Sequence, residues 1–246
     1  MTPQAIQQTL VLIKPDALKL SLTGYVLSQL SEFHTGLRFA GAKIVHVSRM
    51  LAEEHYAEHK ERFFYPSLIN YLMGRIHYAD APQKRRVIAL VYSGPGAVNK
   101  VRELAGPTNP HDAREKAPGT IRALGTVVPV LDPDGNVLGN RLDNLIHAAA
   151  NESDAEREIK LWFKPEDIMP YMRAYPTAPC DEFYYLHDGR VSTAAAPGAT
   201  CVLDPGHEVW ESDLLALRQI AADQPAACSL DAVMAKYFIN KRCEPD

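Results

Sequence analysis

Three short apolar segments, set between longer stretches with helical spacing, are the feature that most constrains the fold of this chain. The segments lie at residues 9–13, 41–47 and 86–92 and are rich in valine and isoleucine, as buried β-strands are. Residues 24–33 and 51–60 instead place their apolar side chains at helical spacing, which predicts two helices. Strands that alternate with helices, without the uniform repeat of a barrel, predict a single α/β sandwich.

The middle of the chain contains a long segment without periodicity. Residues 106–122 are rich in Pro, Gly, Thr, Asn and Asp, and a long loop of this kind in a compact domain is usually functional. Residues 127–138 then predict a β-hairpin, because two apolar stretches flank the turn sequence Asp-Pro-Asp-Gly at 132–135. A short apolar run at 145–147 and a helix over 153–163 complete this part.

The composition excludes several classes of protein. Of the 246 residues, 46% are hydrophobic and 23% are charged, which is typical of a globular chain that can bury a core without disulfides or metals. The 26 basic and 30 acidic residues give a net charge of −4, so neither nucleic acid nor an anionic membrane is the expected partner. No stretch predicts a signal-peptide core or a membrane span. The four cysteines form no C-x-x-C pair, which favours a reduced, cytoplasmic location over a disulfide framework or a zinc knuckle.

The last part of the chain differs in composition from the rest. Residues 194–198 are linker-like, and helical spacing follows at 212–222 and 229–240. We therefore expect a main domain over residues 1–185 and a mostly helical extension over 186–246. The apolar faces of the two helices need a surface to cover, either the chain's own core or a neighbouring subunit; a regulatory or partner-binding arm is the alternative.

One short motif suggests a metal site. His55, Glu58 and His59 have the H-x-x-E-H spacing in which two histidines one helical turn apart bind zinc and the glutamate acts as a base. The motif fixes only three positions in a charge-rich helix, so a solvated helix face is the simpler explanation. The sequence contains neither a P-loop nor a complete dinucleotide-binding fingerprint, which leaves nucleotide binding to other devices.

A second set of residues, spread along the chain, has the chemistry of a phosphate site. Its members are a lysine, two arginines, a threonine, two asparagines and a histidine, namely Lys14, Arg102, Arg122, Thr108, Asn109, Asn144 and His147. Ammonium, guanidinium and hydroxyl groups are the donors that neutralise a polyphosphate. A histidine is also a nucleophile toward phosphorus. Taken singly, each cation is more simply a solvated surface residue.

Six motifs, all in one order, give the chain a resemblance to the nucleoside diphosphate kinases. They are Ile-Lys-Pro-Asp at 13–16, Arg-Phe-Phe-Tyr-Pro at 62–66, Thr-Asn-Pro at 108–110, Pro-Gly-Thr-Ile-Arg at 118–122, Asn-Leu-Ile-His at 144–147 and Glu-Ile-Lys-Leu-Trp-Phe at 158–163. The resemblance implies a ferredoxin-like βαββαβ sandwich with an antiparallel four-stranded sheet. It also implies a ping-pong reaction in which the γ-phosphate of a nucleoside triphosphate such as ATP moves to His147 and then to a nucleoside diphosphate.

The resemblance also implies a role for each matching residue. The expected catalytic residues are the nucleophile His147, the carboxylate Glu158 that orients its ring, Lys14, and the neighbouring tyrosine Tyr56. The expected nucleotide contacts are Lys14, Arg102, Thr108 and Arg122 for the phosphates, Phe64 and Leu68 for the base, and Asn144 with Lys14 for the ribose 3′-hydroxyl. Glu58 matches the acidic residue that acts through water on phosphate-bound Mg²⁺, so Mg²⁺ is the expected cofactor. Residues 55–59, which carry the H-x-x-E-H match, then become part of a helical hairpin beside the nucleotide.

The chain departs from the family pattern near the histidine and in its loops. Ala148, Ala149 and Ala150 replace the usual Gly-Ser-Asp, and loss of one such hydrogen bond predicts a rate about five- to tenfold lower. Leu20 replaces a common basic residue, and extra residues lie near 76–84 and 124–143. The resemblance implies a homo-oligomer, but the segments through which compact members assemble are altered here, so no particular oligomeric state follows.

Two alternatives to an ordinary nucleoside diphosphate kinase stay open. The triple alanine and the extension also suit a nucleotide-binding sensor or scaffold of low turnover. The insertions instead suit a phosphotransferase whose pocket takes a specialised acceptor, which keeps the chemistry and changes the substrate.

Overall fold

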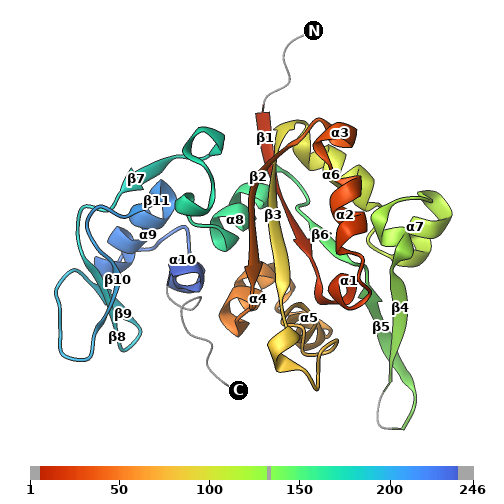
Figure 1. Cartoon of the computed structure of the whole chain (residues 1–246). Helices are drawn as coiled ribbons and strands as arrows, with labels where there is room; N and C mark the ends of the chain where they lie inside the picture. The colour runs from red at the N-terminus through yellow and green to blue at the C-terminus, as the bar shows by residue number, and fades with distance from the viewer. Residues whose placement is uncertain (1–5, 132–133, 238–246) are drawn as a thin grey trace.

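A four-stranded antiparallel sheet forms the centre of the computed structural model, which describes residues 6–131 and 134–237 (Figure 1). Its strands lie in the order β2-β3-β1-β6, and each neighbouring pair is antiparallel. Their bounds are β1 Ile6–Ile13, β2 Arg38–Val45, β3 Val87–Pro95 and β6 Ile146–Ala148. The predicted strands are therefore confirmed to within a few residues, and so is an α+β fold built on an antiparallel sheet.

The alternation of side chains along β1 builds an apolar core on each face of this sheet. Leu10 and Leu12 pack on one face, Val11 and Ile13 pack on the other, and all four are fully buried. Because successive side chains of a strand point to opposite faces, both faces need a cover of helices. One face is covered by α1 Pro15–Lys19, α2 Thr23–Gln29 and α6 Ala97–Ala105, and the other by α4 Arg49–His55, α5 Tyr65–Leu72 and α8 Glu152–Trp162 (Figure 1).

Two of the predicted helices end earlier than their apolar spacing indicates. The helix expected over 24–33 stops after α2 and resumes as the short α3, Glu32–Thr35, which Gly36 ends in a left-handed conformation with a φ of 67°. The helix expected over 51–60 is α4, which ends at His55 and is followed by a 3₁₀ turn, η1 Ala57–His59. The H-x-x-E-H motif therefore spans the end of a helix, and its two histidines do not share one helix face.

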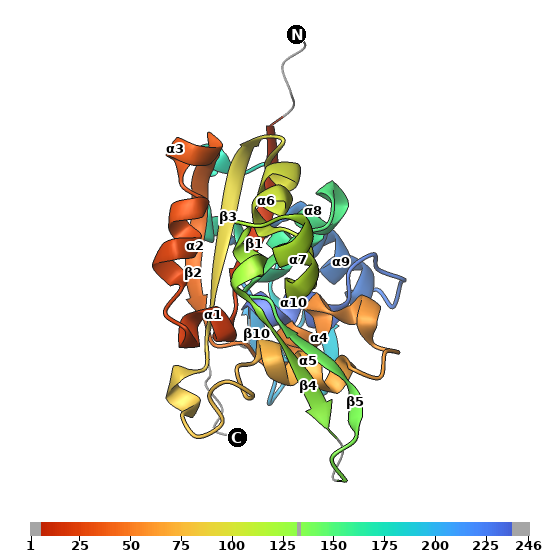
Figure 2. The ribbon, with the colours of Figure 1, turned by 90° about the vertical axis from the view of Figure 1, so that its right-hand side faces the viewer.

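The segment expected to be a loop at 106–122 contains helical structure. The helix α7, Pro110–Lys116, begins with a proline behind the capping side chain of Asn109, and the 3₁₀ turn η3, Ile121–Leu124, follows. The predicted hairpin is confirmed as β4 Thr126–Leu131 and β5 Val137–Asp143, which project from the body of the molecule (Figure 2). Part of its expected turn, residues 132–133, lies outside the described residues.

The C-terminal extension combines helices with short strands, so the expectation of a mostly helical segment was wrong. The elements from residue 177 onward are β7 Thr177–Pro179, which lies in the expected main domain, and then β8 Tyr184–His187, β9 Arg190–Ser192, β10 Thr200–Leu203, β11 Glu208–Trp210, α9 Glu211–Ala221 and α10 Leu230–Tyr237. The strands form a small sheet in the order β10-β8-β9 and a ribbon of β11 with β7, so β8 crosses the expected boundary at residue 185. Each strand has only three or four residues, too few for alternation to stand out. Both predicted helices are present, although residues 238–240 of the second lie outside the described part of the chain.

The extension packs on the chain's own core, which is one of the two surfaces expected for its helices. Trp210 and Ala235 belong to the apolar core between α4, α8 and the sheet. The indole N–H of Trp210 donates to the carbonyl of Phe163 at 2.7 Å. Between α9 and α10, Lys236 Nζ lies 3.0 Å from Asp213 Oδ2, and neither side chain is more than 2% exposed. The extension is therefore attached to the core by both apolar and polar contacts.

Three short 3₁₀ turns complete the described elements: η2 Pro82–Lys84, η4 Pro165–Asp167 and η5 Pro170–Met172. Each begins with a proline, whose fixed φ suits the first helical position. Cys180, Cys201 and Cys228 are free thiols, and Cys243 lies outside the described residues. Within residues 6–131 and 134–237, no helix combines the length and the apolar character needed to cross a membrane.

Candidate active site

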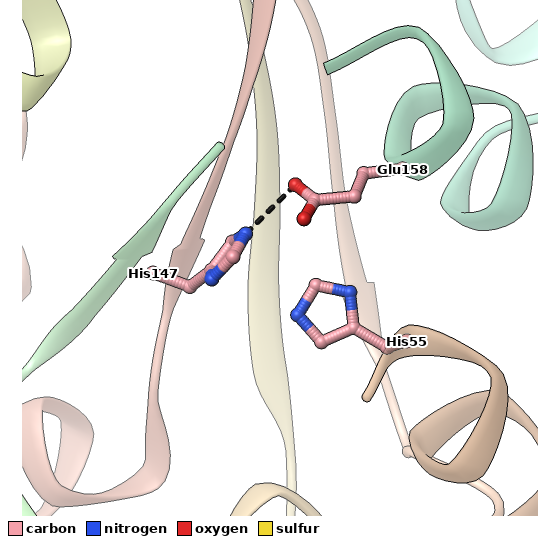
Figure 3. Close-up of side chains that lie close together, drawn as sticks. All are labelled: His55, His147 and Glu158. Carbon is pink, nitrogen blue, oxygen red and sulfur yellow. Dashed lines mark hydrogen bonds and ion pairs between the residues drawn. The ribbon is translucent and has the colours of Figure 1, made fainter. Parts of the chain in front are cut away.

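The predicted nucleophile and its carboxylate partner lie in contact at the edge of the sheet. His147 lies on β6, opposite Leu12 of β1, and Glu158 lies on α8. The Nε2 atom of His147 is 2.7 Å from Oε2 of Glu158 (Figure 3). The side chain of Glu158 is 5% exposed and that of His147 is 18% exposed, so the histidine alone of this pair retains appreciable access from outside.

Burial sets the protonation states of this pair. It lowers the pKa of His147 to about 3, and the nearby cations Arg122 and Lys14 act in the same direction. The imidazole is therefore neutral at neutral pH. Because Nε2 faces the carboxylate of Glu158, it carries the ring proton, which leaves the lone pair on Nδ1. A neutral imidazole with a free nitrogen and an oriented ring is what nucleophilic attack requires.

A second buried histidine, His55 at the end of α4, lies against this pair. Its ring centroid is 4.5 Å from that of His147, and the two planes are nearly perpendicular at 80°. The indole N–H of Trp162 donates to His55 Nδ1 at 3.2 Å, so the ring proton of neutral His55 is on Nε2, which faces His147 (Figure 3). Within the described residues this Nε2 has no hydrogen-bond partner. Sequence reasoning missed this contact, because only the fold brings α4 and β6 together.

The zinc site suggested by the H-x-x-E-H motif does not form. Among the described residues, the three metal-ligating groups that cluster are His55, His147 and Glu158, and only the first belongs to the motif. His59 instead lies beside the rings of Tyr56 and Phe64, with centroids 6.0 and 5.9 Å away. In the cluster, Nε2 of His55 carries a proton and Nε2 of His147 faces Glu158. Nδ1 of His147 is therefore the one histidine nitrogen of the cluster with a free lone pair, too few for a zinc site.

A buried lysine and asparagine form the second part of the site. Lys14 caps α1, and its ammonium contacts Oδ1 of Asn144 and lies 4.6 Å from the centre of the Tyr71 ring. The amide of Asn144 donates to the carbonyl of Thr108 at 2.8 Å. Lys14, Asn144 and Thr108 are therefore brought together, as the sequence motifs predict.

The backbone that leads into β6 is held in an unusual conformation. Leu145 has a φ of 70°, a left-handed value that costs a side-chain-bearing residue about 1–2 kcal/mol. Its N–H donates to Oδ2 of the buried Asp16 at 2.8 Å, and its carbonyl accepts from the N–H of Lys14 at 2.9 Å. These two bonds hold the turn from which His147 emerges two residues later.

The cations expected at the phosphates come from η3 and α6. Arg122 is 8% exposed, and its guanidinium donates to the carbonyls of Gly106 at 2.9 Å and Ile146 at 3.3 Å. Burial, with repulsion from Arg102, lowers the pKa of Arg122 to about 10, so it remains a cation at neutral pH. Arg102, on α6, and Thr108 are exposed. One buried and one exposed arginine therefore lie within electrostatic reach of each other.

The remaining predicted residues line the segment from the end of α4 to α5. Burial raises the pKa of Tyr56, and the nearby Glu158 adds to this rise, so its phenol stays protonated. Phe64, which precedes α5, is 40% exposed, and Leu68 on α5 is partly buried. Glu58 projects from η1 with a side chain that is 65% exposed. An exposed aromatic ring and an exposed carboxylate are available to a ligand on this side.

The sequence matches a known family model over residues 7–168, about two thirds of the chain, and the model describes the nucleoside diphosphate kinases. The chain belongs to the nucleoside diphosphate kinase family. It is 40% identical over 169 residues to the nucleoside diphosphate kinase of Pyrococcus furiosus, an alignment that covers 69% of this chain and 90% of the relative. Residues 169–246, which include the extension, lie outside the family match.

Solved structures agree with this membership. The nucleoside diphosphate kinase of Aquifex aeolicus has a TM-score of 0.55 and 29% identity, over 67% of this chain and 100% of that one. A transition-state mimic of the Borrelia burgdorferi kinase, with bound vanadate and ADP, has a TM-score of 0.51 and 32% identity, over 69% of this chain and 94% of that one. The similarity therefore covers nearly the whole of each solved kinase.

Proposed function

We propose that this chain is a nucleoside diphosphate kinase that passes the γ-phosphate of a nucleoside triphosphate to a nucleoside diphosphate through phospho-His147. The observation that carries the proposal is the 2.7 Å contact of His147 Nε2 with Glu158, which leaves Nδ1 free as the nucleophile. The relative crystallised with vanadate and ADP supports phosphoryl transfer in this family. Attack by Nδ1 forms the N–P bond as the bond to the leaving diphosphate breaks, and the second half-reaction reverses these roles with a new diphosphate.

In this proposal, the cations supply most of the catalysis. The transition state of phosphoryl transfer spreads negative charge over the phosphoryl oxygens, so positioned positive groups stabilise it. Lys14, Arg102 and Arg122, with the hydroxyl of Thr108, hold the phosphates. The ring of Tyr56 lies 4.6 Å from that of His55, which packs against His147. Glu158 holds the His147 ring and its proton in place during the attack. Asn144 and Lys14 reach the ribose 3′-hydroxyl, and the base stacks on Phe64 beside Leu68.

Mg²⁺ is part of the same proposal, and the exposed carboxylate of Glu58 fits its requirements. One oxygen of this carboxylate, Oε1, lies 3.4 Å from Nε2 of His59, and the side chain is 65% exposed, so its oxygens are accessible to water. Mg²⁺ is commonly held by phosphates, several waters and one or two carboxylates. The bound ion would offset phosphate charge. Glu58 would hold it indirectly, through water.

Three further properties belong to the proposal. The sheet order β2-β3-β1-β6 supports a ferredoxin-like core, followed by an extension over residues 186–246. Exposed apolar side chains on the edge strand β2, Phe39 at 43% and Ile44 at 68%, support assembly into a homo-oligomer. The free thiols of the described cysteines support a reducing compartment such as the cytoplasm. Light scattering at several protein concentrations tests the oligomeric state.

A phosphoprotein assay with an acceptor panel tests the function. Wild-type protein incubated with γ-labelled ATP should carry a label that is labile in acid and stable in base, and ADP, GDP, CDP and UDP should each discharge it. Label without discharge would favour a sensor or scaffold, as the triple alanine at 148–150 also suggests. Discharge by only one acceptor would favour a specialised phosphotransferase.

The pKa of Lys14 predicts how the activity depends on pH. Burial lowers this pKa to about 8; the nearby Asp16 opposes the shift and Arg122 adds to it. The ammonium is charged below this value and loses its proton as the pH rises through it, so attraction for substrate oxygens declines. We expect kcat/KM, which reports the free enzyme, to fall about tenfold per pH unit above the midpoint. In Lys14→Arg the fall should move to higher pH; an unchanged midpoint would exclude Lys14 as the group responsible.

The alanine that replaces the family serine predicts a variant that is more active than the wild type. Ala149 is fully buried and packs with Val98 and with Ala155, which precedes Glu158 by one turn of α8. We expect Ala149→Ser to raise kcat about five- to tenfold by restoring one hydrogen bond beside the pair. The exposed Ala150→Ser serves as the control. Equal rates in the wild type and in Ala149→Ser would show that the alanine does not limit turnover.

A further inference from the structure

The two segments that the sequence marks as insertions meet beside the sugar side of the proposed site. His77 belongs to the 76–84 segment, and Asp143 is the last residue of β5 in the 124–143 segment. Nε2 of His77 is 2.9 Å from Oδ2 of Asp143, and the two side chains are only 9% and 13% exposed. A partly buried, charge-assisted contact therefore joins two segments that are far apart in the sequence.

A second residue, Arg141, also binds the carboxylate of Asp143. Arg141 donates to both of its carboxylate oxygens, at 2.7 and 3.1 Å. Burial alone would raise the pKa of Asp143, but the hydrogen bonds from His77 and Arg141 lower it to about 2. The carboxylate is therefore ionised at neutral pH, and His77 donates to it through Nε2–H.

Two connections link His77 to the pair formed by Lys14 and Asn144. The first is covalent, since Asp143 directly precedes Asn144, whose Oδ1 accepts from the ammonium of Lys14. The second passes through Tyr71, which is 2% exposed. Its ring centroid is 5.2 Å from that of His77 and 4.6 Å from Nζ of Lys14. His77 is therefore linked to Asn144 through Asp143 and to Lys14 through Tyr71.

The loop that carries His77 is held by bonds of its own. The guanidinium of Arg85 donates to the carbonyls of Tyr78 and Ala79, each at 3.0 Å. Gly74, with a φ of 76°, makes the turn before His77, and its carbonyl accepts from the N–H of Tyr78 at 2.9 Å. His77 is therefore presented from a fixed backbone, as a residue that positions other groups requires.

We propose that His77 is a positioning residue that acts through Asp143 and Tyr71 to hold Asn144 and Lys14 where they bind the ribose 3′-hydroxyl of the nucleotide. The inference rests on the proposed function, because the sugar contact is part of it. It assigns the two insertions a shared role, which is to hold in place the two residues that bind the ribose. Arg141 fixes the carboxylate through which His77 acts.

The test compares two acceptors that differ in one hydroxyl. Phosphorylated enzyme is prepared with ATP and purified, and the transfer rate is then measured in single turnovers with ADP and with 3′-deoxyadenosine diphosphate. We expect His77→Gln to slow transfer to ADP about five- to tenfold, since a hydrogen bond that positions the pair is lost. Transfer to the 3′-deoxy acceptor, which lacks the hydroxyl, should change less than about twofold. Because both rates come from one preparation, their ratio does not depend on the fraction of folded protein.

Two further variants strengthen the comparison. Asp143→Asn should produce the same selective loss, and the double variant with His77→Gln should lose no more than either single variant. His187→Gln, a matched change of a half-exposed histidine on β8, should leave both rates unchanged. An equal loss with both acceptors, or no loss in His77→Gln, overturns the inference while the kinase function stands. Failure of the wild-type phosphoenzyme to form or to discharge to ADP overturns both.

Discussion

Replacing His147 by alanine is expected to lower kcat for phosphate exchange between ATP and a second nucleoside diphosphate by at least about 10⁴-fold. The variant lacks the nitrogen that accepts the phosphoryl group, while Glu158, Lys14 and Arg122 remain in place. Binding of nucleotide should therefore persist, with a dissociation constant near that of the wild type. Steady-state exchange, together with the acid-labile label from γ-labelled ATP, measures the effect.

The controls for this variant separate the nucleophile from the rest of the site. His187→Ala removes an exposed histidine of β8 and should leave both exchange and labelling intact. His55→Ala removes the ring that packs against His147 but keeps the nucleophile, so the acid-labile label should still form. If His147→Ala were labelled as strongly as the wild type, another residue would carry the phosphate and the proposed mechanism would be wrong.

The largest loss of stability is expected for Lys236→Met in the extension. Nζ of Lys236 lies 3.0 Å from Oδ2 of Asp213, and the two side chains are 1% and 2% exposed. Tyr237 also donates to this carboxylate, at 3.2 Å. Removing the ammonium leaves a buried carboxylate without its counter-ion, which typically costs about 3–5 kcal/mol. Urea unfolding at neutral pH, followed by circular dichroism, measures the free energy of unfolding.

Two matched variants identify the origin of this loss. Arg49→Met breaks an exposed pair on α4, Arg49 with Glu53 at 2.7 Å, and should cost no more than about 0.5 kcal/mol. Lys236→Met combined with Asp213→Leu removes both charges and should recover most of the loss, because no unpaired charge remains. A change below about 1 kcal/mol in Lys236→Met would mean that water reaches the carboxylate.

The strands of the central sheet were predictable because their signals are local. Buried strands leave runs of apolar residues, and β1, β2 and β3 were found from these runs. The contacts of His147 with Glu158 and of Lys14 with Asn144 join distant positions, so spacing alone does not reveal them. They were expected only because the motifs of a known family occur in order along the chain.

Other parts were missed for physical reasons. The strands of the extension are too short to show alternation, although Asp188 and Gly189, with φ values of 47° and 74°, form the two-residue turn between β8 and β9. The Asp-Gly pair is a known hairpin signal that was available in the sequence. The ring contact of His55 with His147 and the place of His77 beside the site were not predicted, because each arises from a tertiary contact. A single sequence carries no trace of such a contact.

Because Trp210 and Ala235 lie in the core, this chain is a poor candidate for division into fragments that fold separately. A fragment trimmed to the family-matched residues 7–168 would present to water the apolar surface that α10 now covers on α4 and α8. It would also leave the carbonyl of Phe163 without the indole that donates to it. We therefore expect the extension and the kinase core to unfold in one cooperative transition. Substitutions accepted in one part must therefore preserve its packing against the other, as they must between neighbouring helices of a single domain.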